Sequence, residues 1–342
     1  MTAQRPAYPQ TLTDLWQKAT APRSDDAPTL VSTFAGCGGS SLGYHAAGFR
    51  ELLAVEWEPH AAAHLRMNFP EVKVHEGDIA QVGKDSLDLA PGELDVLDGS
   101  PPCQGFSMAG KRQVADIRNT LFTEFLRLAD VWKPKVLVME NVPGMARGRT
   151  RPIFLACMQG FAETGYRAEA RILRGDRLGG ASIRQRLYII GVREDLGVEP
   201  TFPSPTYGYS LREALENVDA SPSPRMARQV ASLIPYMAPG TSGDTLLSTN
   251  NRGSNYFGTW RADWAKPVRT LLKHNQRAGV VHPVENRYLS ITEMKRVQGF
   301  PDEYVFEGTP EQIQDRIGNS VMPPMAMRVG LAVRDKILDR LR

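Results

Sequence analysis

Cysteine is scarce in this chain: Cys37, Cys103 and Cys157 are its only thiols, and no two of them form a Cys-x-x-Cys pair. We therefore expect a reducing, cytoplasmic location without disulfides, and no metal site, because structural zinc needs clustered ligands. Long apolar runs are absent, so the sequence offers no membrane span. The N-terminus also lacks the apolar segment of a secretory signal.

An excess of one charge is missing as well. The 41 basic and 38 acidic residues leave a net charge of +3, which is too small to identify a partner. Hydrophobic residues make up 42% and charged residues 23% of the chain, which are values of a globular protein with a sizeable core. A length of 342 residues allows two domains, or one domain with an insertion.

The pattern along the chain changes several times. It predicts an arm (1–28), an α/β body (29–193), a loop-rich insertion (194–285), a hinge (286–310) and a C-terminal segment (311–342). A short helical pattern in the arm would dock Leu12, Leu15 and Trp16 on the body. Apolar runs in the body predict strands at 30–34, 51–55, 72–74, 94–97, 136–139, 166–173 and 186–192. Helical patterns separate most of these runs, which predicts a Rossmann-like sheet with helices on both faces.

A glycine-rich turn, Ala35-Gly36-Cys37-Gly38-Gly39, follows the first expected strand. Its backbone can approach a ligand closely, and the helix that follows favours anions at its N-terminus. Glu56 ends the next strand twenty positions after Gly36, a spacing at which a carboxylate accepts ribose hydroxyls. Trp57 offers a ring for stacking on adenine. A plain tight turn is the alternative, but the acid at this spacing favours a nucleoside-containing cofactor.

Polar residues stand at other element ends. Asp78 follows the third expected strand, where it either accepts a hydrogen bond from an adenine amino group or caps the next helix. A loop is expected after the helix that ends near Gly299. Beyond this loop, Gly318-Asn319-Ser320 offers a close backbone approach at the start of a last, apolar helix.

Cys103 stands in the turn Gly99-Ser100-Pro101-Pro102-Cys103. Consecutive prolines cannot continue a strand, so the chain must leave the sheet there with the thiol at the tip of a stiff turn. A lone cysteine is commonly a small buried residue. Here Glu140 ends the next strand at the same edge, and Arg184 and Arg186 open the last strand. This convergence favours a reactive thiol.

The insertion contains a basic, aromatic stretch between residues 252 and 277. Its basic residues are Arg252, Arg261, Lys266, Arg269, Lys273 and Arg277, and Tyr256, Phe257, Trp260 and Trp264 lie among them. A solvated loop is the default interpretation, but this pattern suits phosphate contact and base readout in nucleic acid. Lysine suits phosphates, and the planar fork of arginine suits a guanine edge.

In this order the motifs resemble those of bacterial-type DNA (cytosine-5)-methyltransferases, from about Leu30 to the C-terminus. The matching segments are Phe34 to Gly39, Glu56-Trp57, Gly77-Asp78-Ile79, Gly99 to Ser107, Glu140-Asn141-Val142, Arg184-Gln185-Arg186, Arg287 to Pro301 and Gly318 to Val321. The resemblance implies a Rossmann-like S-adenosylmethionine-dependent methyltransferase domain at 29–193, to which 311–342 returns. It makes 194–285 a smaller target-recognition domain.

The resemblance also implies a reaction. A flipped-out cytosine in a short double-stranded DNA sequence would receive, at carbon-5, the methyl group of S-adenosyl-L-methionine. The thiolate of Cys103 would add to carbon-6, Glu140 would assist at ring N3, and a water would take the carbon-5 proton. Arg184 and Arg186 would steady the base carbonyl and orient Glu140.

The binding residues follow from the same resemblance. The cofactor residues would be Phe34, Ala35, Gly36, Gly38, Gly39, Glu56, Trp57, Asp78, Ile79, Pro101, Leu121, Asn319, Ser320 and Val321. The DNA contacts would be Gln104, Ser107, Arg118, Arg252, Arg261, Lys266, Arg269, Thr270 and Lys273. We expect a monomeric, nucleoid-associated bacterial protein with a restriction endonuclease as its functional counterpart.

The sequence departs from the family pattern at two places. Gly179-Gly180-Ala181-Ser182 stands where Gly-x-Pro-Gln is usual, which leaves the conformation of that loop open. Ser32-Thr33-Phe34 occupies the position where the family usually has Asp-Leu-Phe, and this replacement removes an acidic contact beside the glycine turn.

Other functions stay open at this point. They are a tRNA cytosine methyltransferase of similar fold, an inert DNA-binding relative and a nicotinamide dehydrogenase. Gly105-Phe106-Ser107 after the Cys-Gln pair favours DNA over tRNA. The presence of Cys103 and Glu140 argues against an inert relative, and a dehydrogenase does not need the Pro-Pro-Cys turn.

Overall fold

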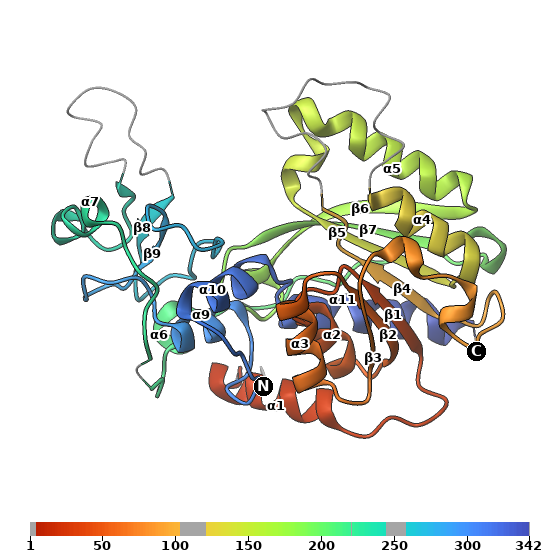
Figure 1. The fold of residues 1–342 in the computed structure, drawn as a ribbon, viewed down its shortest axis with the longest axis horizontal. Helices are drawn as coiled ribbons and strands as arrows, with labels where there is room; N and C mark the ends of the chain where they lie inside the picture. The colour runs from red at the N-terminus through yellow and green to blue at the C-terminus, as the bar shows by residue number, and fades with distance from the viewer. Residues whose placement is uncertain (1–4, 103–120, 220, 244–257, 342) are drawn as a thin grey trace. The chain divides into compact units, whose positions relative to one another are not determined.

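The computed structural model describes residues 5–102, 121–219, 221–243 and 258–341. The chain divides into two compact units (Figure 1). We call the first the sheet unit; it comprises Ala19–Leu173, Gln185–Ser204 and Ala326–Arg342. We call the other the loop-rich unit; it comprises Met1–Lys18, Arg174–Arg184 and Pro205–Met325.

The sheet unit is organised around a seven-stranded sheet of order β3-β2-β1-β4-β5-β7-β6 (Figure 1). Its strands are β1 (Thr29–Thr33), β2 (Arg50–Glu56), β3 (Lys73–Glu76), β4 (Val96–Gly99), β5 (Val136–Asn141), β6 (Tyr166–Arg174) and β7 (Gln185–Arg193). Strands β1 to β5 pair in parallel, and β7 is antiparallel to β5. The strand order reverses between β1 and β4, where open α/β sheets bind ligands at their carboxyl edge. Every strand expected in the body is present, with small shifts at the ends.

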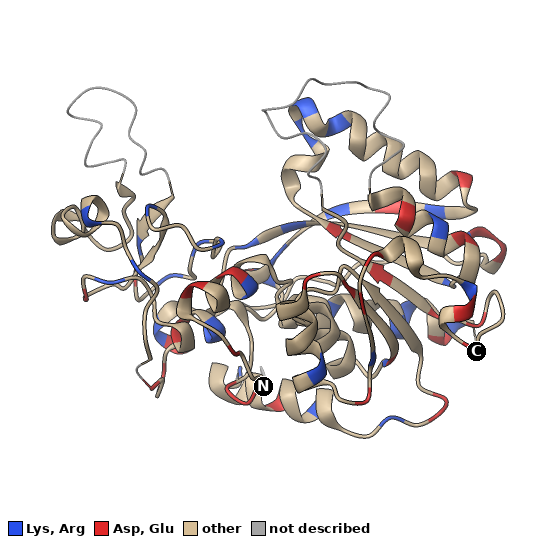
Figure 2. Ribbon diagram, viewed as in Figure 1, with Lys and Arg blue, Asp and Glu red and all other residues tan. Residues whose placement is uncertain are grey.

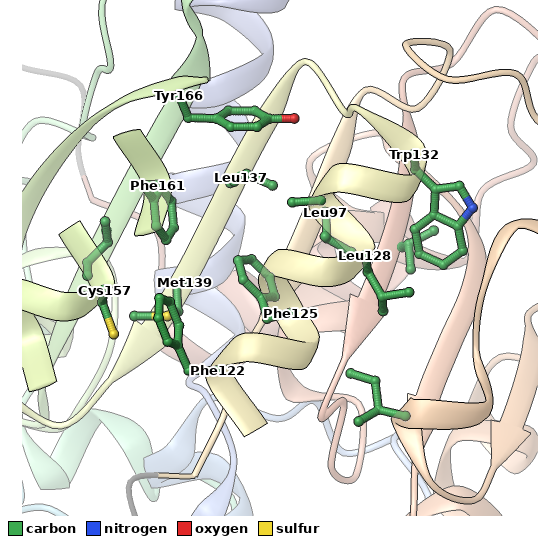
Figure 3. Packing of buried hydrophobic residues seen from close by; sticks show 14 of the residues in the cluster. Leu97, Phe122, Phe125, Leu128, Trp132, Leu137, Met139, Cys157, Phe161 and Tyr166 are labelled. Atoms are coloured by element: carbon green, nitrogen blue, oxygen red, sulfur yellow. The ribbon is translucent and has the colours of Figure 1, made fainter. Parts of the chain in front are cut away.

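Helices cover both faces of this sheet, as predicted (Figure 1). On one face lie α4 (Leu121–Trp132) and α5 (Arg151–Glu163), whose Phe125 and Phe161 join Leu97 and Met139 in a continuous buried core (Figure 3). On the other face lie α2 (Gly39–Ala46), α3 (Pro59–Asn68) and α11 (Pro323–Lys336). Because each large apolar side chain that is fully buried stabilises the fold by about 1.5–3 kcal/mol, this core holds the strand ends in place.

The loop-rich unit consists of short elements around a second core. They are α1 (Tyr8–Thr20), α6 (Leu211–Ala214), α7 (Arg228–Ala231), β8 (Thr259–Arg261), β9 (Gly279–Val281), α9 (Ile291–Gln298) and α10 (Pro310–Asn319). The start of α1 is fixed by Tyr8, whose hydroxyl donates to the Arg296 carbonyl at 2.9 Å. Leu12 is buried in this core of the loop-rich unit, whereas the arm was expected to dock on the α/β body.

Helix α10 occupies a stretch that we expected to be a loop. Thr309 accepts from the Gln312 backbone in a capping box, and Pro310 takes the first helical position, which together start the helix. Gly318-Asn319 therefore ends α10, and the last helix begins later, at Pro323. The expectation that Gly318 opens a helix was wrong.

Several absences hold for the part of the chain that the structure describes. No helix within it is long and apolar enough to cross a bilayer. No three His, Cys, Asp or Glu side chains within the same ranges cluster as metal ligands. Cys37 and Cys157, the two cysteines inside these ranges, are buried and are not joined in a disulfide.

Candidate functional site

The glycine-rich turn between β1 and α2 meets Glu56 at the carboxyl edge of the sheet. Phe34 (φ +54°) and Gly36 (φ +58°) adopt left-handed conformations that reverse the chain. A Cβ at Gly36 would meet no atom within 4 Å, so the backbone angle and not the packing favours glycine there. Glu56 accepts hydrogen bonds from the backbone N–H of Gly36 at 2.7 Å and of Glu58 at 2.9 Å. Glu56, which stands twenty positions after Gly36, thus fixes the conformation of the glycine-rich turn.

Glu56 and Trp57 have the chemistry that a nucleoside needs. Glu56 is 7% exposed, and burial raises its pKa against the effect of the backbone hydrogen bonds. Each of its carboxylate oxygens accepts one N–H and has a further lone pair for a hydroxyl. The Trp57 side chain is 79% exposed, which leaves its ring available for stacking. These residues fit the ribose and base of a nucleoside cofactor.

The other expected cofactor residues lie in both units. In the sheet unit, Asp78 caps the short helix η1 (Ile79–Gln81) by accepting from the Ala80 N–H at 3.0 Å, so its capping role is confirmed. Ile79 and Pro101 are buried there, and Leu121 opens α4 with 39% of its side chain exposed. In the loop-rich unit, Asn319 is exposed, whereas Ser320 and Val321 are buried.

The turn that leads to Cys103 is held by Asn141, a role that sequence analysis missed. The Asn141 Nδ2 donates to the Pro101 carbonyl at 2.9 Å, and its Oδ1 accepts from the Val142 N–H at 2.9 Å. Because prolines have no N–H to donate to the sheet, this side chain supplies a tie between the turn and β5. Cys103 itself, with Gln104, Ser107 and Arg118, lies outside the described residues.

Glu140 and Arg186 meet because β7 runs antiparallel to β5. Glu140 is paired in register with Tyr188, which brings the start of β7 alongside the end of β5. The Arg186 Nε lies 2.7 Å from Glu140 Oε1, and the Glu140 side chain is 8% exposed. Among the described residues, Glu140 Oε1 has no partner with hydrogen-bond geometry, so its contact with Arg186 is an ion pair. Oε1 can therefore still accept a hydrogen bond from another donor. Arg186 therefore orients Glu140, as expected.

Arg184 has partners that differ from those expected. It belongs to the loop-rich unit and is 1% exposed, with terminal nitrogens that donate to the carbonyls of Leu271 at 3.3 Å and Ser320 at 2.9 Å. The terminal nitrogens of the Arg184 guanidinium are thus engaged in hydrogen bonds with backbone carbonyls. The structure thus gives no support to a contact between Arg184 and the base carbonyl.

Asp98, near the end of β4, is a second buried acid that sequence analysis missed. It is 3% exposed, and its Oδ1 accepts a hydrogen bond from the Tyr44 hydroxyl of α2 at 3.1 Å. Its register partner on β1 is Ser32, the residue that stands where the family has an acid. The sequence contained one signal of this buried acid, which is an acidic residue inside the otherwise apolar run 96–99. A carboxyl group is therefore present beside the glycine turn, on the neighbouring strand.

Asp98 predicts a pH-dependent stability. Burial, helped by the charges of Glu140 and Glu51, raises its pKa from 3.8 to about 7, while hydrogen bonds with Tyr44 and Ser40 oppose this. The folded protein therefore binds a proton that the unfolded chain releases, so stability falls as pH rises from about 4 to about 7. A shift of three units corresponds to roughly 4 kcal/mol as an upper value.

Asp98→Asn mimics the protonated carboxyl and cannot ionise. We expect this variant to match wild type at pH 5 and to unfold at a higher temperature than wild type at pH 8, measured by thermal denaturation. An equal decline of both proteins between these pH values would show that Asp98 is not the responsible group.

The basic stretch of the loop-rich unit contains both buried and exposed residues. Figure 2 marks the Lys and Arg positions along the ribbon. Arg261 is 7% exposed and donates to the Asn286 Oδ1 at 2.6 Å, which contradicts its expected contact with DNA. Arg269 is exposed, and its guanidinium lies 3.6 Å from the centre of the Trp260 ring. Arg252 lies outside the described residues.

The lysines of this stretch are accessible. The Lys266 side chain is 70% exposed, 3.2 Å from Asp263, and Lys273 is exposed. Thr270 is half-buried. These positions suit contact with phosphates better than packing.

The sheet order, antiparallel β7 and the Gly36–Glu56 contact define a class of protein, the Rossmann-like methyltransferases. The family model for C-5 cytosine-specific DNA methylase matches residues 29–334. The chain belongs to this family and is a DNA cytosine-5 methyltransferase, which excludes the dehydrogenase alternative.

Relatives of known name agree with this assignment. The chain is 34% identical to the type II methyltransferase M.Eco47II of Escherichia coli, over 93% of this chain and 81% of that protein. It is 34% identical to M.Sau96I of Staphylococcus aureus, over 88% of this chain and 74% of that protein. A solved DNA modification methyltransferase encoded within an E. coli prophage shares the fold with a TM-score of 0.74, at 21% identity over 91% of this chain and all of that one.

Proposed function

We propose that this methyltransferase uses S-adenosyl-L-methionine to methylate a flipped-out cytosine within one short double-stranded DNA sequence. The observation that carries the proposal is the Glu140–Arg186 pair, 2.7 Å apart at the strand end beside the turn that Asn141 ties to Pro101. A carboxyl group there serves chemistry on a base, because a cytosine ring must be activated before carbon-5 becomes nucleophilic.

In the proposed reaction the Cys103 thiolate adds to carbon-6 of the extruded cytosine. The electron pair of the 5,6 double bond then forms a double bond between carbons 4 and 5, and the pair of the carbon-4–N3 double bond takes a proton at N3 from Glu140 in its acid form. When bound, S-adenosyl-L-methionine supplies the methyl group that carbon-5 receives. Loss of the carbon-5 proton to water then restores the 5,6 double bond and expels the Cys103 thiolate, and N3 returns its proton to Glu140. Arg186 keeps the Glu140 carboxyl in place through the contact between Arg186 Nε and Glu140 Oε1.

In the sheet unit, the 34–39 turn, Glu56 and Trp57 would hold the methyl donor. Gly36 and the rest of the 34–39 turn would allow the donor to approach the backbone closely. Glu56 would accept hydrogen bonds from its ribose hydroxyls, and the Trp57 ring would stack on its adenine. The open space beside Gly36, the unused lone pairs of Glu56 and the exposed ring of Trp57 support this assignment. In the loop-rich unit, Ser320 and its neighbours 319 and 321 are the residues that we propose to contact the donor.

The names of the relatives support a pairing with a restriction endonuclease, since M.Eco47II and M.Sau96I are type II methyltransferases. The proposal is tested by transfer of tritium-labelled methyl groups from S-adenosyl-L-methionine to duplex DNA and to tRNA. We expect label in duplex DNA alone, on cytosine. Label in tRNA and not in DNA would overturn it.

Within the basic stretch we predict a division of roles. Lys266→Ala and Lys273→Ala should weaken binding equally for all sequences and lower the salt slope by about one each, because they release fewer counterions. Arg269→Ala should instead cost about 1–3 kcal/mol at one base pair of the recognised sequence, because stacking on Trp260 orients its planar fork.

Binding isotherms on cognate and random duplexes at several salt concentrations distinguish these effects. Lys84→Ala in the sheet unit is the control for loss of one positive charge. Equal weakening of both duplexes by Arg269→Ala would assign base readout to other residues.

A further inference from the structure

Three segments that are distant in sequence meet around Arg184 in the loop-rich unit. The backbone of Val268 exchanges hydrogen bonds with its neighbours in space, donating to the Ala181 carbonyl at 2.8 Å and accepting from the Ile183 N–H at 2.8 Å. Arg184 follows directly and donates to Leu271 and Ser320 carbonyls. We call the Arg184 guanidinium with these two carbonyls the Arg184 clamp.

The loop that departs from the family pattern therefore has a defined place. Ala181 and Ser182 pair with Val268, so the chain reaches Arg184 in a fixed path. Ser182 is fully buried, and its Oγ accepts from the Arg184 N–H at 3.2 Å. Residues 181–183, which lead into Arg184, are thus held by Val268. Val268 belongs to the same segment as Leu271, whose carbonyl accepts from Arg184.

The Leu271 segment and the end of α10 touch through backbone. A Cβ at Gly318 would lie 2.5 Å from the carbonyl carbon and oxygen of Leu272 and 2.7 Å from the Lys273 nitrogen. Backbone atoms at these distances cannot yield, so glycine is required for this contact. This role replaces the close approach to a ligand that the sequence suggested for Gly318.

Side chains of α10 hold the same segment. The His274 N–H donates to Asp315 Oδ1 at 2.6 Å, and His274 Nδ1 lies 3.1 Å from Gln314 Oε1. Any displacement of residues 271–274 is therefore transmitted to the end of α10, and so to Ser320.

Gln298 contacts Ser320 from a different direction. It is fully buried, and its Nε2 donates to the Ser320 carbonyl at 2.8 Å and to its Oγ at 3.1 Å. Gln298 thus fixes the Ser320 turn, and neither of these two bonds reaches Leu271. This difference makes Gln298 a matched control for Arg184.

We propose that Arg184 is a positioning residue that couples DNA recognition to cofactor binding. The inference rests on the proposed function, in which Arg269, Thr270 and Lys273 contact DNA and Ser320 contacts the cofactor. One rigid guanidinium fork joins the two sites, so each bound ligand favours the clamp geometry that the other needs. Coupling between binding sites is reciprocal, and typical factors are about fivefold or more.

The test is the affinity for S-adenosylhomocysteine, the product of the donor, with and without a duplex that carries the methylated sequence. We expect the duplex to tighten binding to wild type by about fivefold or more. Arg184→Lys keeps the charge but lacks the fork, so the ratio should fall to within about twofold of one. Gln298→Met should weaken binding with and without DNA and leave the ratio unchanged.

Gly318→Ala is the second variant, which keeps every donor of the clamp but displaces the Leu272 carbonyl, and it should also lower the ratio. Thermal denaturation shows which variants are folded. A folded Arg184→Lys or Gly318→Ala protein with the wild-type ratio would overturn the inference, as would a wild-type ratio of one. Failure of wild type to bind S-adenosylhomocysteine or duplex DNA at all would instead overturn the proposed function.

Discussion

Cys103→Ala is expected to abolish methyl transfer and to leave cofactor binding nearly unchanged. The thiolate acts on carbon-6 of the base and has no role in holding the methyl donor, so the variant should retain wild-type affinity for S-adenosylhomocysteine. Without an attacking group, carbon-5 does not become nucleophilic, and no other side chain in the proposed site replaces the thiolate. The measurement is methyl transfer to duplex DNA under single-turnover conditions.

Cys157→Ala is the matched control, because it removes a thiol that is buried in the core of the sheet unit. It should lower stability and keep the activity. A duplex with 5-fluorocytosine at the target should trap wild type covalently, since fluorine does not leave as a proton does. Substantial methylation by Cys103→Ala, or no trapped adduct, would remove Cys103 from the mechanism.

Glu140→Gln should slow methyl transfer by about two to four orders of magnitude, the range for a lost general acid. The amide keeps the shape of the side chain and an oxygen for the contact with Arg186 Nε, which is 2.7 Å from Oε1 in the wild-type protein. It cannot deliver a proton to ring N3. We therefore expect kcat to fall while KM for the donor stays within a few-fold.

Glu124→Gln is the control for this substitution, since Glu124 forms a surface ion pair with Arg127 on α4. It should have wild-type rates, as exposed pairs contribute little. If Glu140→Gln has a rate within a few-fold of wild type, the proton at N3 comes from another source.

Much of the sheet unit could be predicted because its signals are local. Apolar runs such as 136–139 end at a polar residue or a glycine, and each became a strand. The spacing of Glu56 after the glycine-rich turn predicted an acceptor for ribose hydroxyls, and the structure adds a contact with the Gly36 N–H that the sequence did not predict. Asp78 was placed correctly as a cap because capping depends on neighbours in sequence.

The errors concern residues whose partners are far away along the chain. Arg184 resembles a catalytic arginine in sequence, but its carbonyl partners lie 87 and 136 positions away. Gly318 was interpreted as a ligand-facing glycine, because nothing local shows that Leu272 packs on it. Arg261 is basic in a basic stretch, yet Asn286 and the second core enclose it. These facts depend on tertiary packing, which local patterns do not encode.

The capping box at Thr309 shows a different kind of miss. Thr309, Pro310 and Gln312 are a local helix signal, and it was overlooked because the segment before Gly318 looked like a loop. Asp98 falls between the expected strand 94–97 and the turn that begins at Gly99, and a single acid at the end of a short apolar run did not indicate its burial.

The central claim, sequence-specific methylation of cytosine carbon-5, is tested most directly by bisulfite sequencing of genomic DNA. The cells should lack other cytosine methyltransferases and express either wild type or Glu140→Gln. We predict that wild type protects the cytosine at one position of a single short sequence throughout the genome, and that Glu140→Gln leaves that position almost fully converted. Complete conversion in cells that express folded wild type, or protection scattered without a common sequence, would contradict the account.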